Sequence, residues 1–175
     1  GVLGMLGLLI NTKLNEDQRH KAELAKSSAE SLLTLISDIL DFSKVEAGKM
    51  ELEMLDFNLR SMMGNFAESM ALRAQAKGIE IVLDVTQIEQ SVVKGDPSRL
   101  RQILTNLVSN AIKFTHHGEI IIRAKTVVVK KNNICFSCCV EDTGLGIPPS
   151  KISSLFDSFS QVDASTTRKY GGTGL

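Results

Sequence analysis

Apolar side chains recur at helical spacing over two segments of the first 48 residues, Gly1–Thr12 and Glu16–Glu46, and both are predicted to be helices. Asn15, followed three residues later by Gln18, is a suitable capping pair for the second helix. Gly48 suits a left-handed residue just beyond its end. The second helix carries a broad stripe of apolar and small side chains: Leu24, Ser28, Ser31, Leu32, Leu35, Ile36, Ile39, Leu40 and Phe42.

Two helices alone cannot bury both of their apolar faces. Residues 1–48 are therefore expected to form a partial helical hairpin that dimerises into a four-helix bundle. The alternative is a hairpin that packs against the rest of its own chain. The pattern favours the dimer, and both structures stay open.

From Lys49 onward the pattern changes to mixed helix and strand. Lys49–Phe57 (KMELEMLDF) alternates enough to predict a strand, and Ile79–Val85 predicts a second one. Between them, Asn58 can cap a helix that runs to Lys77 and ends at Gly78. Six side chains of this helix are expected to point inward, the methionines as core filler: Leu59, Met62, Met63, Phe66, Met70 and Ala74.

A helix is also predicted over Asp96–Thr115, with its first residue as N-cap and Pro97 in its first turn. Asn106, Asn110 and Lys113 are spaced four and three apart, so they share one face of this helix. This face offers two neutral amides and one cation, where an amphipathic helix usually exposes plain solvated charge. The apolar face is expected to consist of Leu100, Leu104, Leu107 and Ala111.

Two further apolar segments, Glu119–Val129 and Ile134–Asp142, predict a hairpin about Lys130–Asn133. A glycine-containing turn (DTGLGIPP) and a short helix near Ser150–Leu155 follow. Helices in this order with antiparallel strands predict an α+β chain, whose residues 49–175 form an α/β sandwich with helices on one sheet face.

Composition excludes several functions. With 20 basic and 20 acidic residues, a strongly cationic surface for nucleic acid is not expected. An aromatic content of 5% without Trp argues against aromatic side chains on which the bases of single-stranded nucleic acid would stack. Cys135, Cys138 and Cys139 lack a second cluster at metal-ligand spacing, so we expect reduced cytosolic thiols and no zinc. No apolar run approaches the ~20 residues that cross a bilayer.

We therefore expect a cytoplasmic segment that does not contact a membrane, and leave open whether the parent protein is anchored in the inner membrane. Because the chain starts without Met and ends inside a glycine motif, we expect a piece of a longer protein.

The polar face of the helix at 96–115 suits a nucleotide. Mg²⁺ takes oxygen ligands and keeps several waters, so one side-chain amide with phosphate oxygens is sufficient, and we assign that amide to Asn110. Lys113, one turn on, would meet phosphate charge. Asp142 closes a strand and opens a turn, where a carboxylate can face a donor such as an adenine amine. Gly144 and Gly146 permit backbone conformations and close approach that a Cβ would obstruct.

The end of the chain is also rich in glycine. Gly171, Gly172 and Gly174 can offer backbone N–H groups to phosphates. The polar, Ser/Thr-rich stretch before them has the composition of a mobile lid, with Arg168 and Lys169 available to the terminal phosphate.

Four motifs occur in the order of one family. NLVSNAIKF resembles the N box of sensor histidine kinases of two-component systems, and DTGLGI resembles their first glycine box. LFDSFSQVD resembles their F box, and YGGTGL the start of their second glycine box. SLLTLISDILDFSKVEAGKMELE is similar to the second dimerisation helix and linker of the same family, especially its hybrid members. The resemblance covers nearly all 175 residues.

This resemblance implies a dimerisation and histidine-phosphotransfer bundle followed by an ATP-binding domain of the Bergerat type, with ATP and Mg²⁺ as cofactors. Asn110 would bind Mg²⁺, Asn106 and Lys113 would act at the phosphate end as catalytic residues, and Asp142 would bind the adenine amino group. The implied partners are a second copy of the chain and the receiver domain of a response regulator. Other implied nucleotide-binding positions are Gly144, Gly146, Ile147, Phe159, Arg168, Gly172, Thr173 and Gly174.

Two features depart from the family. Ser158 stands where proline is usual in the F box, beside Phe156 and Phe159, which would anchor the lid. The family's phosphoacceptor histidine lies in an HExRTP-type motif, which the family's spacing places upstream of this chain. The three histidines of this chain, His20, His116 and His117, do not lie in such a motif. We therefore expect that this chain cannot phosphorylate itself.

Two other functions stay open. An ATPase on the same fold, resembling chaperone, gyrase or mismatch-repair ATPases, needs a carboxylate near the start of the N box to activate water, and Asn106 stands there instead. A non-catalytic dimerisation or scaffold module would bind nucleotide without transferring phosphate.

Overall fold

The computed structural model describes residues 1–131 and 133–154. Gly1–Met50 and Glu51–Ile152 belong to two separate compact units. The predictions for Ser158 and for the lid and terminal glycines lie outside the described residues. They concern Phe156, Phe159, Arg168, Lys169, Gly171, Gly172, Thr173 and Gly174.

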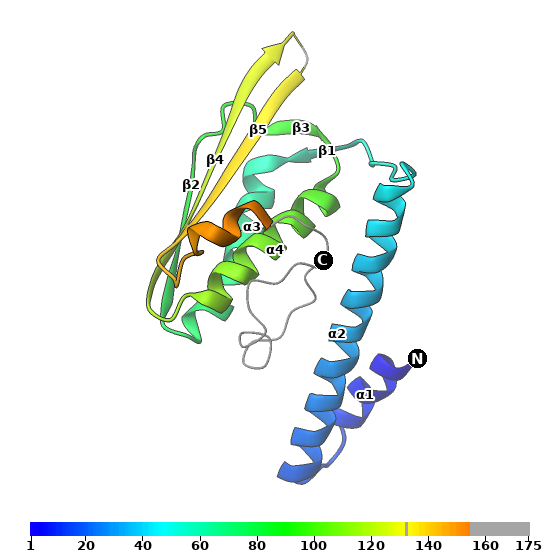
Figure 1. The fold of residues 1–175 in the computed structure, drawn as a ribbon. Helices are drawn as coiled ribbons and strands as arrows, with labels where there is room; N and C mark the ends of the chain where they lie inside the picture. Colours follow the sequence, from blue (N-terminus) through cyan, green and yellow to red (C-terminus); the bar gives the residue numbers. More distant parts are fainter. Residues whose placement is uncertain (132, 155–175) are drawn as a thin grey trace. The chain divides into compact units, whose positions relative to one another are not determined.

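The first unit is a pair of helices, α1 (Val2–Ile10) and α2 (Glu16–Glu46), as the pattern predicts (Figure 1). The capping pair is confirmed: the Gln18 amide N–H donates to Asn15 Oδ1 at 2.8 Å, and the Asn15 amide N–H donates to Gln18 Oε1 at 3.1 Å. Gly48 is left-handed, with φ of 62°. The start of α2 is therefore capped by Asn15, and the left-handed Gly48 lies just beyond its end.

The helices of the first unit leave most of their apolar side chains exposed. On α2 only Ala22 is buried, and α1 has no buried residue. The exposed apolar side chains include Leu24, Leu32, Leu33, Ile36, Ile39, Leu40 and Val45. No described helix is both long and apolar enough to cross a membrane.

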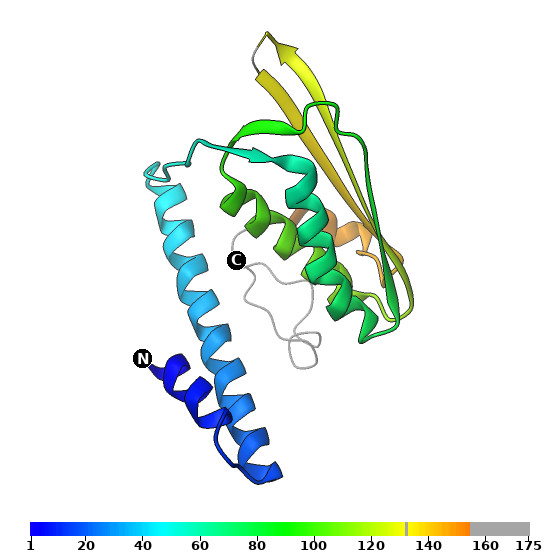
Figure 2. The same cartoon turned by 180° about the vertical axis from the view of Figure 1, so that it is seen from behind.

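The second unit has two layers, with α3 (Leu59–Gln75) and α4 (Pro97–Phe114) on one face of a sheet (Figures 1 and 2). This sheet has the order β2 (Ile79–Gln87), β4 (Gly118–Lys130), β5 (Asn133–Asp142). A separate antiparallel pair joins β1 (Leu55–Asn58) to β3 (Val92–Gly95). A 3-10 helix, η1 (Pro149–Ser154), lies where the short helix is predicted. The predicted α+β class is thereby confirmed.

The strand pairing differs from the prediction in one respect. The predicted hairpin is present, since β4 and β5 pair antiparallel from Ile120 with Asp142 to Lys130 with Asn133. However, β2 and β4 pair parallel, Ile79 opposite Gly118, and not antiparallel as predicted. The reason is the connection: α4 lies between these strands in sequence, so the chain crosses over and enters β4 in the direction of β2.

The strand predicted over Lys49–Phe57 is correct only in part. The alternating segment that begins at Lys49 is a strand only over Leu55–Asn58, and β3 had not been predicted. Both strands have four residues, too few for the alternation of polar and apolar side chains to define them.

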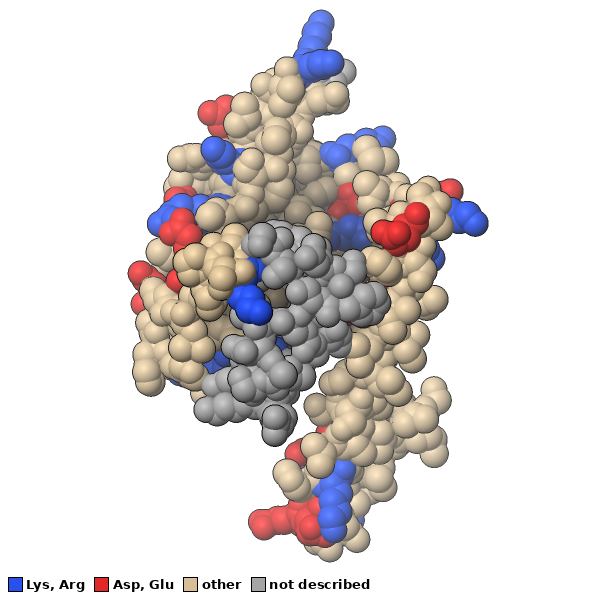
Figure 3. All heavy atoms as spheres, viewed as in Figure 1, with Lys and Arg blue, Asp and Glu red and all other residues tan. Residues whose placement is uncertain are grey.

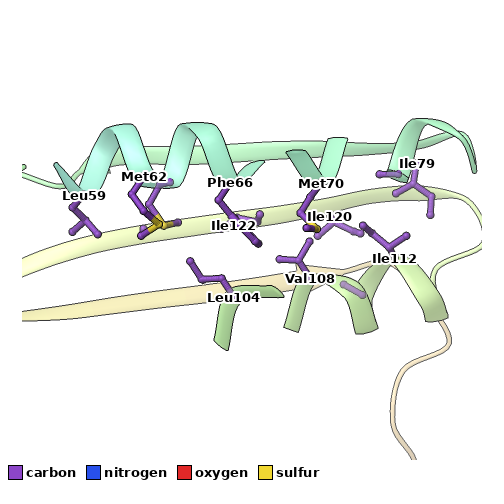
Figure 4. Packing of buried hydrophobic residues seen from close by; sticks show 14 of the residues in the cluster. Leu59, Met62, Phe66, Met70, Ile79, Leu104, Val108, Ile112, Ile120 and Ile122 are labelled. Carbon is purple, nitrogen blue, oxygen red and sulfur yellow. The ribbon is translucent and has the colours of Figure 1, made fainter. Parts of the chain in front are cut away.

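One hydrophobic core fills the space between helices and sheet (Figure 4). All six side chains of α3 that were expected to point inward are buried, Phe66 and Met63 with no exposed area. The strands contribute mainly Ile79, Ile120 and Ile122. The residues from α4 are Leu104, Val108, Ala111 and Ile112.

The apolar face predicted for α4 is wrong at one position. Leu107, which was expected to be buried, is 45% exposed. Its neighbour Val108 is fully buried in its stead. Positions 104, 108, 111 and 112 lie within one helical stripe, and Leu107 falls outside it.

On the face of the molecule that Figure 3 shows, the described acidic and basic side chains are interspersed. Neither sign gathers into one large patch there, as the balanced composition suggests.

Candidate functional site

The residue before α4 fixes the start of this helix. Asp96 Oδ1 accepts hydrogen bonds from the Ser98 amide at 3.0 Å and from the Arg99 amide at 2.9 Å, which confirms the predicted N-cap. Its second carboxylate oxygen accepts from the Glu53 amide at 3.1 Å. The bond from the Arg99 amide is the largest cause that lowers the pKa of Asp96 below its usual value. One ionised side chain therefore ties α4 to the segment before β1.

The polar face of α4 is accessible. Asn106 and Asn110 are exposed, and Lys113 is half-buried. The Lys113 ammonium lies 5.0 Å from the centre of the Phe114 ring, within range of a cation–π contact. The three side chains that were assigned to phosphate and Mg²⁺ thus lie along the last turns of one helix.

The turn after β5 is joined to the end of that helix. Asp142 Oδ1 accepts a hydrogen bond from the Gly144 amide at 2.9 Å, which closes a tight turn. The next residue along the chain makes the link to the helix: the Leu145 amide donates to the Phe114 carbonyl at 3.3 Å. The structure therefore brings the exposed Asp142 carboxylate and the Lys113–Phe114 end of α4 into one region.

A second set of contacts ties the same turn to β4. The Glu119 amide donates to Thr143 Oγ1 at 3.1 Å, and the Thr143 amide donates to the Glu119 carbonyl at 3.3 Å. Gly118 is required here because its φ is +112° and a Cβ would lie 2.2 Å from Thr143 Oγ1. The turn is thus held from two sides, by α4 and by the first residues of β4.

The two positions of the turn that are glycine, Gly144 and Gly146, require it for different physical reasons. A Cβ on Gly144 would lie 2.7 Å from both Asp142 Oδ1 and the Phe114 carbonyl oxygen, so a side chain would disrupt the junction. Gly146 has φ of +67°, a conformation that L-residues rarely adopt. The close approach that was predicted at Gly144 is therefore made by the protein's own backbone. Ile147, which was predicted to line the nucleotide, is 49% exposed.

Sequence reasoning missed Phe114 in this region. Its carbonyl receives the Leu145 amide, and its ring lies beneath the Lys113 ammonium. An aromatic residue directly after the lysine, at the end of the helix, was the available signal.

The chemistry of the donors limits how a cation could bind. Among the described residues no three His, Cys, Asp or Glu side chains gather in a group that could hold a metal ion. A Mg²⁺ ion at this site would therefore depend on the Asn110 amide oxygen, waters and ligand phosphates, a set that suits this ion. Among the described residues, hollows of about 270 and 710 Å³ are lined by other parts of the sheet and hairpin.

Comparison with known proteins identifies the family of the chain. Residues 1–48 match the family model of the His Kinase A (phospho-acceptor) domain. Residues 95–175 match the model of the histidine kinase-, DNA gyrase B- and HSP90-like ATPases. The chain belongs to the histidine kinase family.

Curated relatives of this chain are much longer. It is 43% identical over 175 residues to the signal transduction histidine-protein kinase BarA of Escherichia coli, all of this chain against 19% of that protein. It is 41% identical over 174 residues to the hybrid signal transduction histidine kinase L of Dictyostelium discoideum, 99% of this chain against 10% of that one. The chain thus spans a fifth or less of the length of these curated relatives.

Among solved structures, this chain is similar to full-length ShkA in complex with AMPPNP. The two are 36% identical with a TM-score of 0.73, and the match covers 99% of this chain and 35% of that one.

The charge on Asp96 gives a prediction about pH. Because the pKa of Asp96 is lowered in the folded state, its ionisation stabilises the fold above the ordinary value of 3.8, and this contribution is lost as pH falls through the lower folded value. Asp96→Asn keeps an N-cap acceptor without the charge. We predict that its melting temperature lies below that of the unmodified chain at pH 6–7, and that the difference shrinks below pH 3.8. A difference that stays constant over this range would contradict the assignment.

Proposed function

We propose that this chain binds Mg-ATP through α4 and the β5 turn, and that it serves the phosphoryl-transfer step of a sensor histidine kinase. The junction between the Phe114 carbonyl and the Leu145 amide is the observation that carries the proposal. Through it, a helix end with two amides and a lysine lies beside an exposed carboxylate. Similarity to ShkA, which was solved in complex with AMPPNP, supports nucleotide binding by this chain.

Each polar side chain has a separate role in this proposal. Asn110 gives its amide oxygen to Mg²⁺, and Asn106 and Lys113 contact the phosphates. Asp142 accepts a hydrogen bond from the adenine amino group; its carboxylate is exposed, and its turn is fixed by the Gly144 amide. Gly144, Gly146 and Ile147 border the base from the same turn. Arg168, Gly172, Thr173, Gly174 and the lid phenylalanines complete the proposal from outside the described residues.

The chemistry asked of these residues is modest. In phosphoryl transfer the protein mainly positions the reactants and neutralises charge on the phosphate oxygens. Mg²⁺ supplies part of that neutralisation when it is bound, and the Lys113 ammonium supplies more. Asn106, an amide, cannot take a proton from water at neutral pH, which favours transfer to a side chain over hydrolysis.

The acceptor in this proposal is a histidine that is supplied by another part of the protein, and an aspartate on a response-regulator receiver domain then takes the phosphoryl group. His20 is exposed on the first turns of α2, and His116 and His117 are exposed on the turn after α4. All three lie outside any HExRTP-type motif.

The helical pair serves as the dimer interface in this account. We propose a boundary near Gly48, with a phosphotransfer hairpin before it and the ATP-binding domain after it. The exposed Leu32, Ile36, Ile39 and Leu40 of α2 would be buried against a second copy.

Removal of the two best-defined ligand groups should weaken nucleotide binding. Asn110→Ala removes the oxygen proposed for Mg²⁺, and Asp142→Ala removes the adenine acceptor. We predict that each raises the Kd for Mg-ATP by about tenfold or more, as expected for a lost charge-assisted or metal contact. Isothermal titration calorimetry with the whole chain measures this.

Asn65→Ala is the matched control, because Asn65 is an exposed amide on a helix of the same unit. It should leave the Kd unchanged. Unchanged affinity in both site variants, despite binding by the unmodified chain, would refute the site.

A complementation experiment separates a kinase from a scaffold that only binds nucleotide. A second chain that carries the histidine motif but has Asn110 and Asp142 replaced should become labelled by γ-labelled ATP when this chain is added. Labelling should depend on Mg²⁺ and be lost with Asn110→Ala in the donor chain. ATP binding without any transfer in the mixed dimer would favour the scaffold.

A further inference from the structure

The C-terminal turn of α4, like that of every helix, has backbone carbonyls that need hydrogen-bond partners. Its last four backbone carbonyls have no partner within the helix. In α4 these belong to residues 111–114, the turn that contains Lys113 and Phe114. Whatever binds these carbonyls also determines where this end of the site lies.

Three different partners bind the four carbonyls. The Thr115 amide donates to the Ala111 carbonyl at 3.0 Å, and the Leu145 amide donates to that of Phe114 at 3.3 Å. The two carbonyls between them, those of Ile112 and Lys113, are both contacted by one side chain from outside α4. The Lys77 ammonium donates to the Ile112 carbonyl at 2.8 Å and lies 3.5 Å from the Lys113 carbonyl.

The backbone holds Lys77 in place for this contact. Its amide donates to the Ala74 carbonyl at 2.9 Å at the end of α3. Gly78 follows in a left-handed conformation, φ of 71°, and Ile79 then enters the core at 4% exposure. The lysine therefore extends from a tight turn whose two sides are both anchored.

The charge of Lys77 matters as well as its hydrogen bonds. The C-terminal end of a helix carries a partial negative charge, which opposes an anion bound nearby. A cation on these carbonyls offsets that charge where, under the proposed function, a nucleotide triphosphate binds.

From this geometry we infer that Lys77 is a positioning residue of the nucleotide site. It clamps the last turn of α4, so that Lys113, Phe114 and the attached Asp142 turn keep a fixed arrangement. The inference rests on the proposed function for its ligand, but the clamp itself exists without any ligand.

The test uses the whole chain and three variants. Lys77→Met keeps the length and apolar stem but removes the donor and charge, and Lys77→Arg restores both. Lys94→Met is the control, because Lys94 is an exposed lysine on β3, away from α4's last turn.

The first measurement is amide hydrogen exchange without nucleotide. In Lys77→Met, exchange at Thr115 and Leu145 should be about fivefold or more faster, because the carbonyls that they bind lie in the released turn. Exchange at Ile122, buried in β4, serves as the internal reference and should not change. Lys77→Arg and Lys94→Met should match the unmodified chain within about twofold.

The second measurement is the Kd for Mg-ATP. In Lys77→Met it should rise about five- to twentyfold while the binding stoichiometry stays unchanged, and Lys77→Arg should restore it. A fall in stoichiometry at unchanged Kd would indicate simple unfolding and overturn the inference.

Further outcomes separate this inference from the proposed function. Equal acceleration at Ile122, unchanged exchange at Thr115 and Leu145, or no rescue by arginine would each overturn the role of Lys77. Another outcome is that exchange at Thr115 and Leu145 is accelerated in Lys77→Met, but that neither the unmodified chain nor any variant binds nucleotide. This result would refute the proposed function and the positioning role together, and would leave only the contact of Lys77 with the end of α4.

Discussion

Backbone carbonyls at the end of α4 must find partners outside their own helix, and this requirement shapes the region where the polar groups meet. The Phe114 carbonyl takes the Leu145 amide, and so the turn after β5 is fixed to the helix end. Gly144 is needed because any side chain would collide with that carbonyl. Two segments that are distant in sequence are thereby joined through main-chain atoms, and the side chains on both sides of the joint remain accessible.

The core makes this joint possible. Leu104, Val108 and Ile112 fix α4 against the sheet along the face opposite to the two asparagines. Asp96 fixes the other end of the helix through three backbone amides. The position and both ends of the helix are therefore set by residues other than Asn106 and Asn110, which stay exposed. This division between buried and exposed faces is what allows a surface helix to hold a ligand.

The sequence predicted features that depend on local chemistry. The caps at Asn15, Asn58 and Asp96 are as expected, because a cap requires only a few neighbouring residues. The parallel pairing of β2 with β4 and the existence of β3 depend on how distant segments meet, which no local pattern encodes. The same reason applies to the contact between Lys77 and the Ile112 carbonyl, 35 residues apart in sequence. The face of Asn106, Asn110 and Lys113 was visible in the sequence, but its junction with the Asp142 turn required the fold.

We propose that the end of α4 and the turn after β5 form one nucleotide-binding surface in this chain. A crystal structure of the chain with Mg²⁺ and a non-hydrolysable ATP analogue tests it most directly. We predict that the metal binds the Asn110 amide oxygen, that the adenine amino group binds the Asp142 carboxylate, and that the bond from the Leu145 amide to the Phe114 carbonyl stays unbroken. A nucleotide bound elsewhere, or one that reaches this surface only after that bond breaks, would contradict it.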